Sequence, residues 1–224
     1  MRSFSRITKV AIFRYLRAEK RCEMEKPNHR KWKVLSREYL AREPWVTVRR
    51  DRVELPDGRQ IPGYYVFEYP AWVNVLARTA DGLYLFVSQY RHGLGETHYE
   101  LVAGVSEASD AGMEAAARRE LAEETGYRAA SWALAGELHN AIAYSTERIE
   151  VWFARDLTLG QRQLDAGEFL DVFDASQAEL EAWVASGEIT DAKTLVGLLW
   201  LKSWQAGERV LLWQSSEWLG AQPG

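Results

Sequence analysis

Three glutamates and an arginine stand close together just before a glycine, in the segment RELAEETG at residues 119–126. Alanine and glutamate dominate residues 110–125, with Leu121 among them, which predicts a helix over this range. Because residues three and four apart share one face of a helix, Glu120 should lie beside Glu123 and Glu124. Carboxylates held this close repel one another unless a cation lies between them. Hard oxygen ligands suit Mg²⁺ or Mn²⁺, so the spacing favours a divalent-cation site that could bind a diphosphate.

A solvated acidic face is the alternative for any pair of adjacent glutamates on a helix. The order Arg-Glu-Leu-x-Glu-Glu-x-Gly is much narrower than such a pair, and we therefore prefer the metal site. We expect Ser109 or Asp110 to cap the start of this helix, and Gly126 to take the left-handed position after its end.

The segments around this helix have mainly the pattern of strands. Apolar alternation predicts strands within residues 45–69, 72–79, 83–91, 97–104, 131–146, 148–157 and 168–175. Asp81 and Gly82 predict a hairpin between the second and third of these. Helices are predicted at residues 176–187 and 191–204, with Ser176 and Asp191 as N-caps and Gly187 ending the first. Strands with helices inserted and appended indicate a layered α/β or α+β fold.

The bulk composition is that of a globular protein. The 224 residues carry a net charge of −4 with a pI of about 5.7, which argues against nucleic acid or an anionic membrane as the main partner. Cys22 is the only cysteine, and no apolar run approaches the ~20 residues of a membrane span, so a cytoplasmic location is expected. Residues 1–40 are basic and lack a clear period, and we expect residues 1–22 to form an exposed extension or a short helix.

The order of residues 119–126 resembles the second half of the Nudix box, the signature of the Nudix hydrolases. The family pattern is a glycine, five residues, a glutamate, seven residues, and then Arg-Glu-aliphatic-x-Glu-Glu-x-Gly. The first half departs from it, since counting forward from Gly104 puts Asp110 at the first glutamate and counting back from Arg119 puts Ala111 there. The resemblance implies that the glutamates at 120, 123 and 124 bind the metal, together with the backbone carbonyl of Ala103.

Further segments, over roughly residues 45–204, resemble the ADP-ribose pyrophosphatase branch of that family. QYRHG at 89–93 and YELVAG at 99–104 place Arg91 and Glu100 where this branch lines its substrate site. AGEFLDV at 166–172 places Glu168 at the catalytic base, for which Asp165 is a weaker substitute. WVTVRR at 45–50 resembles the N-terminal strand whose aromatic stacks on the nucleobase, which gives a substrate-binding role to residues 45 and 50, Trp45 and Arg50.

The resemblance implies a Nudix-type α/β/α sandwich with a mixed sheet and an N-terminal antiparallel strand subdomain. The expected organisation is a basic extension at 1–40, the strand subdomain at 41–70, the Nudix domain at 71–204 and a tail at 205–224. The strand subdomain of this branch exchanges between two chains, so a homodimer is also implied.

The implied activity is metal-dependent hydrolysis of a nucleoside diphosphate derivative, foremost ADP-ribose to AMP and ribose 5-phosphate. Glu168, Glu123 and Arg119 would serve catalysis, with Arg119 holding the helix glutamates by ion pairs and Arg91 binding phosphate in a bidentate contact. Residues 142–145 lack the proline and glycine usual in this branch, which keeps UDP- and GDP-sugars open as substrates. A nucleotide-binding module without catalysis is the remaining alternative. The structural alternative for Trp45 is a core aromatic, for Arg91 a surface ion pair and for Glu168 a solvated loop acid.

Overall fold

The structure, a computed structural model, describes residues 30–215. The elements of this part of the chain run in the order β1 (Lys33–Glu43), β2 (Val46–Glu54), β3 (Gln60–Glu68), β4 (Ala71–Ala77), β5 (Tyr84–Arg91), β6 (Glu96–Glu100), β7 (Val102–Val105), α2 (Met113–Thr125), β8 (Tyr127–Leu138), β9 (Arg148–Leu159), β10 (Leu170–Ala175), α3 (Gln177–Ser186), α4 (Ala192–Gln205) and β11 (Gln214–Ser215). None of these helices is both long and apolar enough to cross a membrane.

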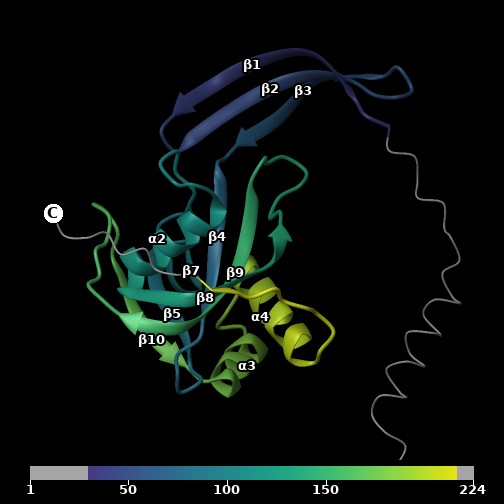
Figure 1. The fold of residues 1–224 in the computed structure, drawn as a ribbon. Coiled ribbons are helices and arrows are strands. Elements are labelled where there is room, and N and C mark those ends of the chain that lie inside the picture. Colours follow the sequence, from purple (N-terminus) through teal and green to yellow (C-terminus); the bar gives the residue numbers. More distant parts are fainter. Residues whose placement is uncertain (1–29, 216–224) are drawn as a thin grey trace, which may run out of the picture.

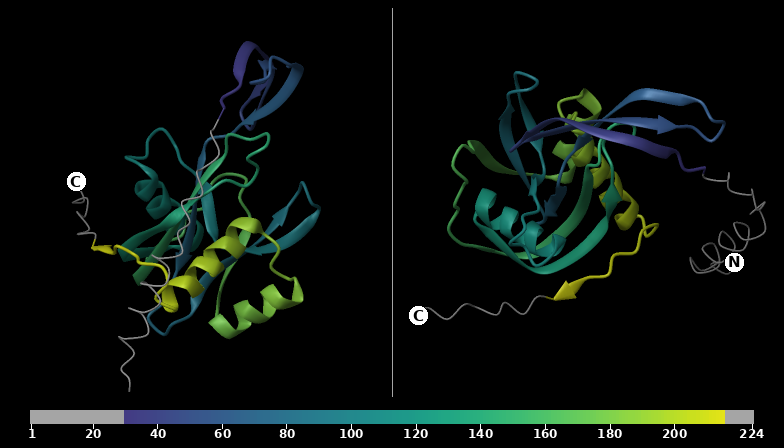
Figure 2. Two further views of the ribbon diagram at one scale, coloured as in Figure 1. Left: turned by 90° about the vertical axis from the view of Figure 1, so that its right-hand side faces the viewer. Right: turned by 90° about the horizontal axis from the view of Figure 1, so that it is seen from above.

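The strands form three sheets, and helices cover the central ones from both sides. The antiparallel sheet β1-β2-β3 stands apart from the body of the molecule (Figure 1). A mixed sheet has the order β11-β8-β9-β4-β7, in which β4 and β9 are parallel, and a smaller sheet has the order β10-β5-β6. Seen from above, α2 lies on one side of these strands and α4 on the other (Figure 2). The expected α/β/α sandwich with an antiparallel N-terminal sheet is therefore confirmed.

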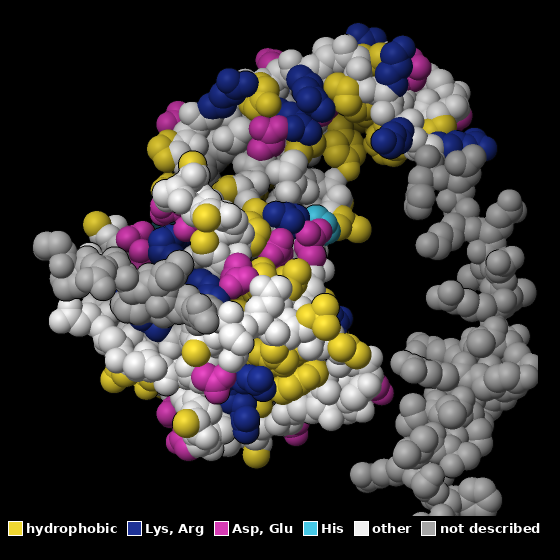
Figure 3. Space-filling model, viewed as in Figure 1, with side chains coloured by type: hydrophobic (Ala, Val, Ile, Leu, Met, Phe, Trp, Pro, Cys, Tyr) yellow, Lys and Arg dark blue, Asp and Glu magenta, His cyan; other side chains and the backbone are white. Residues whose placement is uncertain are grey.

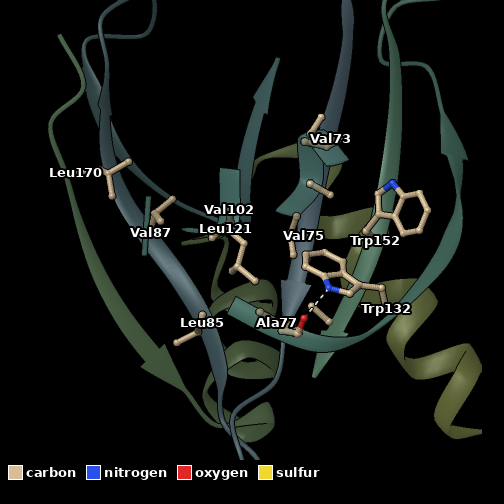
Figure 4. Close-up of a cluster of buried hydrophobic side chains, with 14 residues drawn as sticks. Val73, Val75, Ala77, Leu85, Val87, Val102, Leu121, Trp132, Trp152 and Leu170 are labelled. Carbon is tan, nitrogen blue, oxygen red and sulfur yellow. Dashed lines mark hydrogen bonds between the residues drawn. The ribbon is translucent and has the colours of Figure 1, made fainter. Parts of the chain in front are cut away.

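The core between α2 and the sheets follows from the alternation of side chains along the strands. Val73 and Val75 of β4 point to this core, and Leu121 of α2 packs against them (Figure 4). The large ring of Trp132 is buried here too, and its Nε1–H donates to the carbonyl of Ala129 at 3.0 Å. The one polar atom of that side chain is thus satisfied. A second core lies on the opposite face, among β4, β8, β9, α3 and α4.

The caps of α3 and α4 agree with the sequence, whereas the start of α2 does not. Ser176 makes a capping box at α3 and the Asp191 side chain accepts from Thr194 N at α4, so both predicted N-caps are confirmed. Gly187 and Gly126 end α3 and α2 in the left-handed conformation as expected.

Neither Ser109 nor Asp110 caps α2. The N-cap is Gly112, with φ 142° and no side-chain hydrogen bond. The prediction was wrong because the Asp110 carboxylate contacts Arg119 instead of the first turn.

Two predictions for the strands are confirmed only in part. Asp81 and Gly82 make the expected turn, flanked by the antiparallel bridge between Arg78 and Tyr84 and by a hydrogen bond from Thr79 N to Leu83 O at 2.9 Å, but the pairing stops there because β4 and β5 belong to different sheets. Since β4 already pairs with β9 on one side and β7 on the other, it has no free edge for β5. The expected strand at 97–104 breaks at Leu101, whose N–H donates to Thr194 Oγ1 at 3.0 Å while the chain passes from one sheet to the next.

The ends of the described chain are more ordered than expected. The first strand starts at Lys33, inside the segment 1–40 assigned to a basic extension, and both faces of this strand are largely exposed, which hides the period of two. Residues 1–29 of that segment lie outside the described residues. In the expected tail, Leu211 is buried and β11 pairs with β8.

The loop at residues 139–146 joins the N-terminal sheet to the body of the fold. Phe67 N donates to Tyr144 O at 2.7 Å, and Thr146 N donates back to Phe67 O at 3.0 Å. Tyr69 N adds a hydrogen bond to Thr146 Oγ1 at 3.0 Å. The start of β4 and this loop therefore hold the sheet in place together.

Candidate active site

Glu120 lies directly over the glycine that opens the box. A Cβ atom placed on Gly104 would lie 2.0 Å from Glu120 Cδ, so only glycine leaves room for this carboxyl group. Glu120 is 6 % exposed, and burial raises its pKa to about 7 against the attraction of Arg119. The packing of α2 on β7 thus holds an acidic group against the backbone of β7.

Glu124, one turn further along α2, is still more deeply buried. It is 2 % exposed, and its Oε2 atom has no hydrogen-bond partner among the described residues. Burial raises the pKa of Glu124 well above its usual range, and the charges of Glu120 and Glu168 raise it further. The backbone N–H of Ala103 is a hydrogen-bond partner of this carboxylate. No salt bridge within residues 30–215 neutralises this buried carboxyl, and the charge of Arg91 offsets its burial only in part.

Arg119 binds the acids at the edge of this cluster. Its Nη1 donates at 2.8 Å both to Glu120 Oε1 and to Glu123 Oε2. Its Nη2 donates to the carbonyl of Val105 at 2.7 Å. Burial lowers the pKa of Arg119, but hydrogen bonds to Asp110 and Glu123 and the charge of Glu120 outweigh that effect and raise it. The guanidinium therefore ties α2 to the end of β7.

In the irregular first half of the box, Asp110 is the residue that faces Arg119. The Asp110 carboxylate receives Nε and Nη2 of Arg119, each at 3.2 Å, and its side chain is 6 % exposed. The same carboxylate accepts from Glu107 N at 2.8 Å. Ala111, by contrast, is exposed. The forward count from Gly104 identified the residue that faces Arg119, and the extra residue lies between Asp110 and α2.

Arg91 and Glu100 form a bidentate pair on β5 and β6. Arg91 Nε donates to Glu100 Oε1 at 2.6 Å, and Nη2 donates to Oε2 at 2.8 Å. Burial alone would raise the pKa of Glu100, but Arg91 and Lys193 outweigh it and lower the pKa. The charge of Glu124 contributes to the raised pKa of Arg91, so this pair adjoins the acids of α2.

Lys193 was missed by the sequence reasoning. Its Nζ donates to Glu100 Oε2 at 2.6 Å and to Asp191 Oδ1 at 2.9 Å. The lysine and the glutamate are 93 positions apart, and no local spacing connects them.

Glu168 lies in the loop between β9 and β10, and it faces the same cluster. It is half-buried, and its charge raises the pKa of both Glu120 and Glu124. Its Oε2 accepts from the backbone N–H of Asp165 at 3.3 Å. The Asp165 side chain is in the same loop, on an exposed residue.

Trp45 and Arg50 lie on the N-terminal sheet, and no contact within residues 30–215 joins them to the acidic cluster. Trp45 is in the turn between β1 and β2 and is 74 % exposed. Arg50 Nη2 donates to Glu38 Oε2 at 2.5 Å across β1 and β2, and it packs against Gly63 of β3. Trp45 is therefore not a core aromatic of this chain.

The residues of the cluster fit a divalent cation. The side chains gathered here are carboxylates, whose oxygens are ligands that Mg²⁺ prefers. The unpaired Oε2 of Glu124 and the close approach of Glu120 to Gly104 support such a site. Within residues 30–215, no three His, Cys, Asp or Glu side chains are already gathered as a metal site, and Glu120 and Glu123 instead pair with Arg119.

Comparison with known proteins agrees with this geometry. Residues 68–194, more than half of the chain, match the NUDIX domain, and residues 32–67 match the nucleoside diphosphate sugar hydrolase N-terminal domain. An ADP-ribose pyrophosphatase of Bacillus subtilis (strain 168) is 31 % identical over 172 residues, which cover 76 % of this chain and 92 % of the relative. An ADP-ribose pyrophosphatase of Mycobacterium tuberculosis is 30 % identical over 170 residues, 75 % of this chain and 82 % of the relative.

Two further similarities were found. A methanol dehydrogenase activator of Bacillus methanolicus is 29 % identical over 163 residues, 72 % of this chain and 87 % of the relative. The fold is also that of a solved structure described as an ADP compounds hydrolase, with a TM-score of 0.72, 21 % identity, and coverage of 80 % of this chain and 96 % of that one. The chain belongs to the Nudix family, and its matches place it with the Nudix pyrophosphohydrolases of the ADP-ribose pyrophosphatase branch.

Proposed function

We propose that this protein hydrolyses the diphosphate bridge of ADP-ribose, giving AMP and ribose 5-phosphate, with Mg²⁺ as cofactor and Mn²⁺ as a possible substitute. The observation that carries the proposal is the buried carboxyl of Glu124, with an unpaired oxygen beside Glu120 and Glu168. Such an excess of acidic groups suits a cation that in turn holds a diphosphate. The similarity to two ADP-ribose pyrophosphatases supports the substrate.

Glu120, Glu123, Glu124 and the carbonyl of Ala103 are the proposed metal ligands. When bound, the cation neutralises the charge of the diphosphate and stabilises the charge that develops as the bridge breaks. Glu123 and Glu120 share Arg119 in the structure. Arg119 would therefore keep both carboxylates on the correct face of α2.

The other residues of the cluster would bind the substrate and handle the proton. Arg91 presents a planar guanidinium that suits a bidentate contact with a phosphate. Glu168 would accept a proton from a water molecule while the water oxygen attacks one phosphorus. The bond from that phosphorus to the bridging oxygen breaks, and the bridging oxygen leaves with the other phosphate.

A homodimer is proposed for this chain, with the nucleobase stacked on Trp45 and held by Arg50, partly across the interface. Support comes from the large apolar side chains left exposed on the three-stranded sheet and its first turn (Figure 3). These are Val34, Tyr39, Leu40, Trp45, Val46 and Tyr65. Large apolar side chains left exposed together on one sheet mark a surface for association, so a second copy is a suitable cover. A cytoplasmic location, consistent with the single cysteine, remains part of the proposal.

A UDP- or GDP-sugar is the second candidate substrate. The N-terminal match to a nucleoside diphosphate sugar hydrolase domain favours it. The loop at 142–145 contributes too, because it carries the exposed Ile142 and Tyr144 where the branch has proline and glycine. Both candidates use the same ligands and the same Glu168, so they differ only in the bound base and sugar.

A substrate panel tests the proposal. ADP-ribose, UDP-glucose, GDP-mannose, NADH and diadenosine polyphosphates are each incubated with Mg²⁺ or with EDTA, and products are identified by mass. We expect AMP and ribose 5-phosphate only with Mg²⁺, a loss of about 10²–10⁴-fold in turnover for Glu168→Gln, and normal turnover for Glu181→Gln on the exposed face of α3. Faster metal-dependent cleavage of another sugar nucleotide would change the substrate. Binding without turnover on any of them would leave a nucleotide-binding module.

A further inference from the structure

One buried carboxylate, Glu100, is shared by two cations from different elements. Arg91 of β5 holds both of its oxygens, and Lys193 of α4 donates to Oε2 at 2.6 Å. The exposed fractions of the side chains show which end of this network is buried. Glu100 is 3 % and Lys193 11 % exposed, whereas Arg91 is 36 % exposed. Glu100 and Lys193 form the closed end, and Arg91 is the end that a substrate can reach.

The net charge of this network explains why the pair of Arg91 and Glu100 needs a second cation beside it. An arginine paired with a single carboxylate is neutralised by it. Lys193 supplies another positive charge, and its neighbour Asp191 supplies another negative one at 2.9 Å, so the four groups sum to zero. Without Lys193 the sum is −1, close to Glu124, whose charge already acts on Arg91. A diphosphate is an anion, and it binds less well beside a net negative charge.

The backbone around Lys193 is fixed independently of its side chain. Its carbonyl accepts from Asn74 Nδ2 at 3.1 Å, and the next residue, Thr194, receives the N–H of Leu101 at 3.0 Å. Asp191 caps the helix through Thr194 N at 2.9 Å. Removing the lysine amine would therefore leave α4 attached to β4 and to the junction of β6 and β7.

The network also borders open space. A cavity of about 310 Å³ lies beside it, lined by residues that include Arg91, Glu100, Asp191 and Lys193. Glu100 provides the only salt bridge of Arg91 within residues 30–215. The bidentate contact with Glu100 therefore determines where the Arg91 guanidinium points, and the cavity gives it room to turn away when that contact weakens.

We propose that Lys193 is a positioning residue for substrate binding, which acts through Glu100 to hold Arg91 toward the diphosphate and to offset the negative charge around it. This inference rests on the proposed function, since it assigns the anion at Arg91 to a nucleoside diphosphate. It predicts that Lys193 controls affinity for the substrate more than the rate of the chemical step.

The test compares Lys193→Met and Lys193→Arg with Lys202→Met, a matched control on the same helix whose side chain is 58 % exposed and pairs with Glu181. We expect Lys193→Met to raise KM for ADP-ribose about tenfold, the change that corresponds to ~1.4 kcal/mol, with kcat lowered less than threefold. Lys193→Arg should restore most of the affinity, and Lys202→Met should behave as the wild type. The affinity for Mn²⁺ alone, measured by calorimetry, should stay the same in all three variants.

Direct binding separates this inference from the proposed function. ADP-ribose is titrated calorimetrically in EDTA into the wild type and into Lys193→Met. A tenfold weaker binding by the variant would support the role of Lys193 even if the wild type cleaved no substrate. Equal binding, no binding by the wild type, a failure of Lys193→Arg to restore affinity, or a parallel loss of Mn²⁺ affinity would each overturn it. Urea unfolding of every variant identifies a general loss of structure.

Discussion

Replacing Glu120 by glutamine should raise the free energy of unfolding of the metal-free protein at pH 8, compared with the change that the same substitution causes at pH 4.5. The pKa of Glu120 is about 7 in the folded chain and 4.5 when it is unperturbed. A carboxyl whose pKa is raised by folding contributes stability that is fully present below the unfolded pKa and is lost as pH rises through the folded pKa. A shift of one pKa unit corresponds to 1.36 kcal/mol, so the ionised Glu120 should lower the free energy of unfolding by about 3 kcal/mol at pH 8.

The magnitude follows from burial, because Glu120 is almost inaccessible to solvent and screening reduces the effect little. Glutamine resembles the protonated acid and can still accept the hydrogen bond of Arg119. The quantity to compare is therefore the stability difference between variant and wild type at pH 8, minus the same difference at pH 4.5. Glu124 has a raised pKa for the same reason, and removal of its charged neighbour should add to the effect in the same direction.

Urea unfolding in EDTA at several pH values between 4.5 and 8 provides the measurement, with Glu181→Gln as an exposed control. The variant should gain stability over the wild type as pH rises, whereas the control should follow the wild type. Saturating Mg²⁺ at pH 8 should then stabilise the wild type more than Glu120→Gln, since the cation relieves the charge that the variant lacks. A difference that stays constant across this pH range, or a variant that loses stability as pH rises, would refute the reasoning.

Three further outcomes are expected. Gly104→Ala should abolish Mn²⁺ binding in calorimetry, because the added Cβ would lie 2.0 Å from Glu120 Cδ, while Gly93→Ala, which meets nothing within 4 Å, should bind as the wild type does. Asp110→Asn should lower turnover at least tenfold with intact far-UV circular dichroism, since the guanidinium that holds two of the glutamates loses its charged partner; unchanged kinetics would show that this contact is dispensable. Leu121→Ala should cost about 2–5 kcal/mol in urea unfolding because its side chain is completely buried in the core, and a loss below 1 kcal/mol would contradict that packing.

The local part of the site could be predicted from the sequence because helical spacing is a local property. Residues at 120, 123 and 124 must share one side of a helix, whatever surrounds it. The same holds for the caps of α3 and α4, which depend on one side chain and the backbone next to it. Family resemblance supplied the more distant members, Arg91, Glu100 and Glu168, which the structure gathers around these glutamates.

The rest depended on contacts between segments that are far apart in the chain. Lys193 contacts Glu100 only because α4 lies beside β6 in the fold, and no residue spacing in the sequence predicts that contact. The turn at 81–82 was identified, but whether two strands pair depends on which edges are still free, and β4 had none. The strand β1 was missed because its residues are exposed on both faces, so burial imposes no alternation on them.

The chain after α4 covers part of the edge of the main sheet. Leu211 enters the core, Trp213 packs on Trp204 with ring centroids 5.9 Å apart, and β11 pairs with residues 131 and 132 of β8. An uncovered strand edge is a template for pairing with other chains, and natural proteins cover such edges against aggregation. A shortened chain that ended with α4 would expose this edge of β8 together with the ring of Trp204. We therefore expect it to aggregate during expression even though every residue of the acidic cluster is still present.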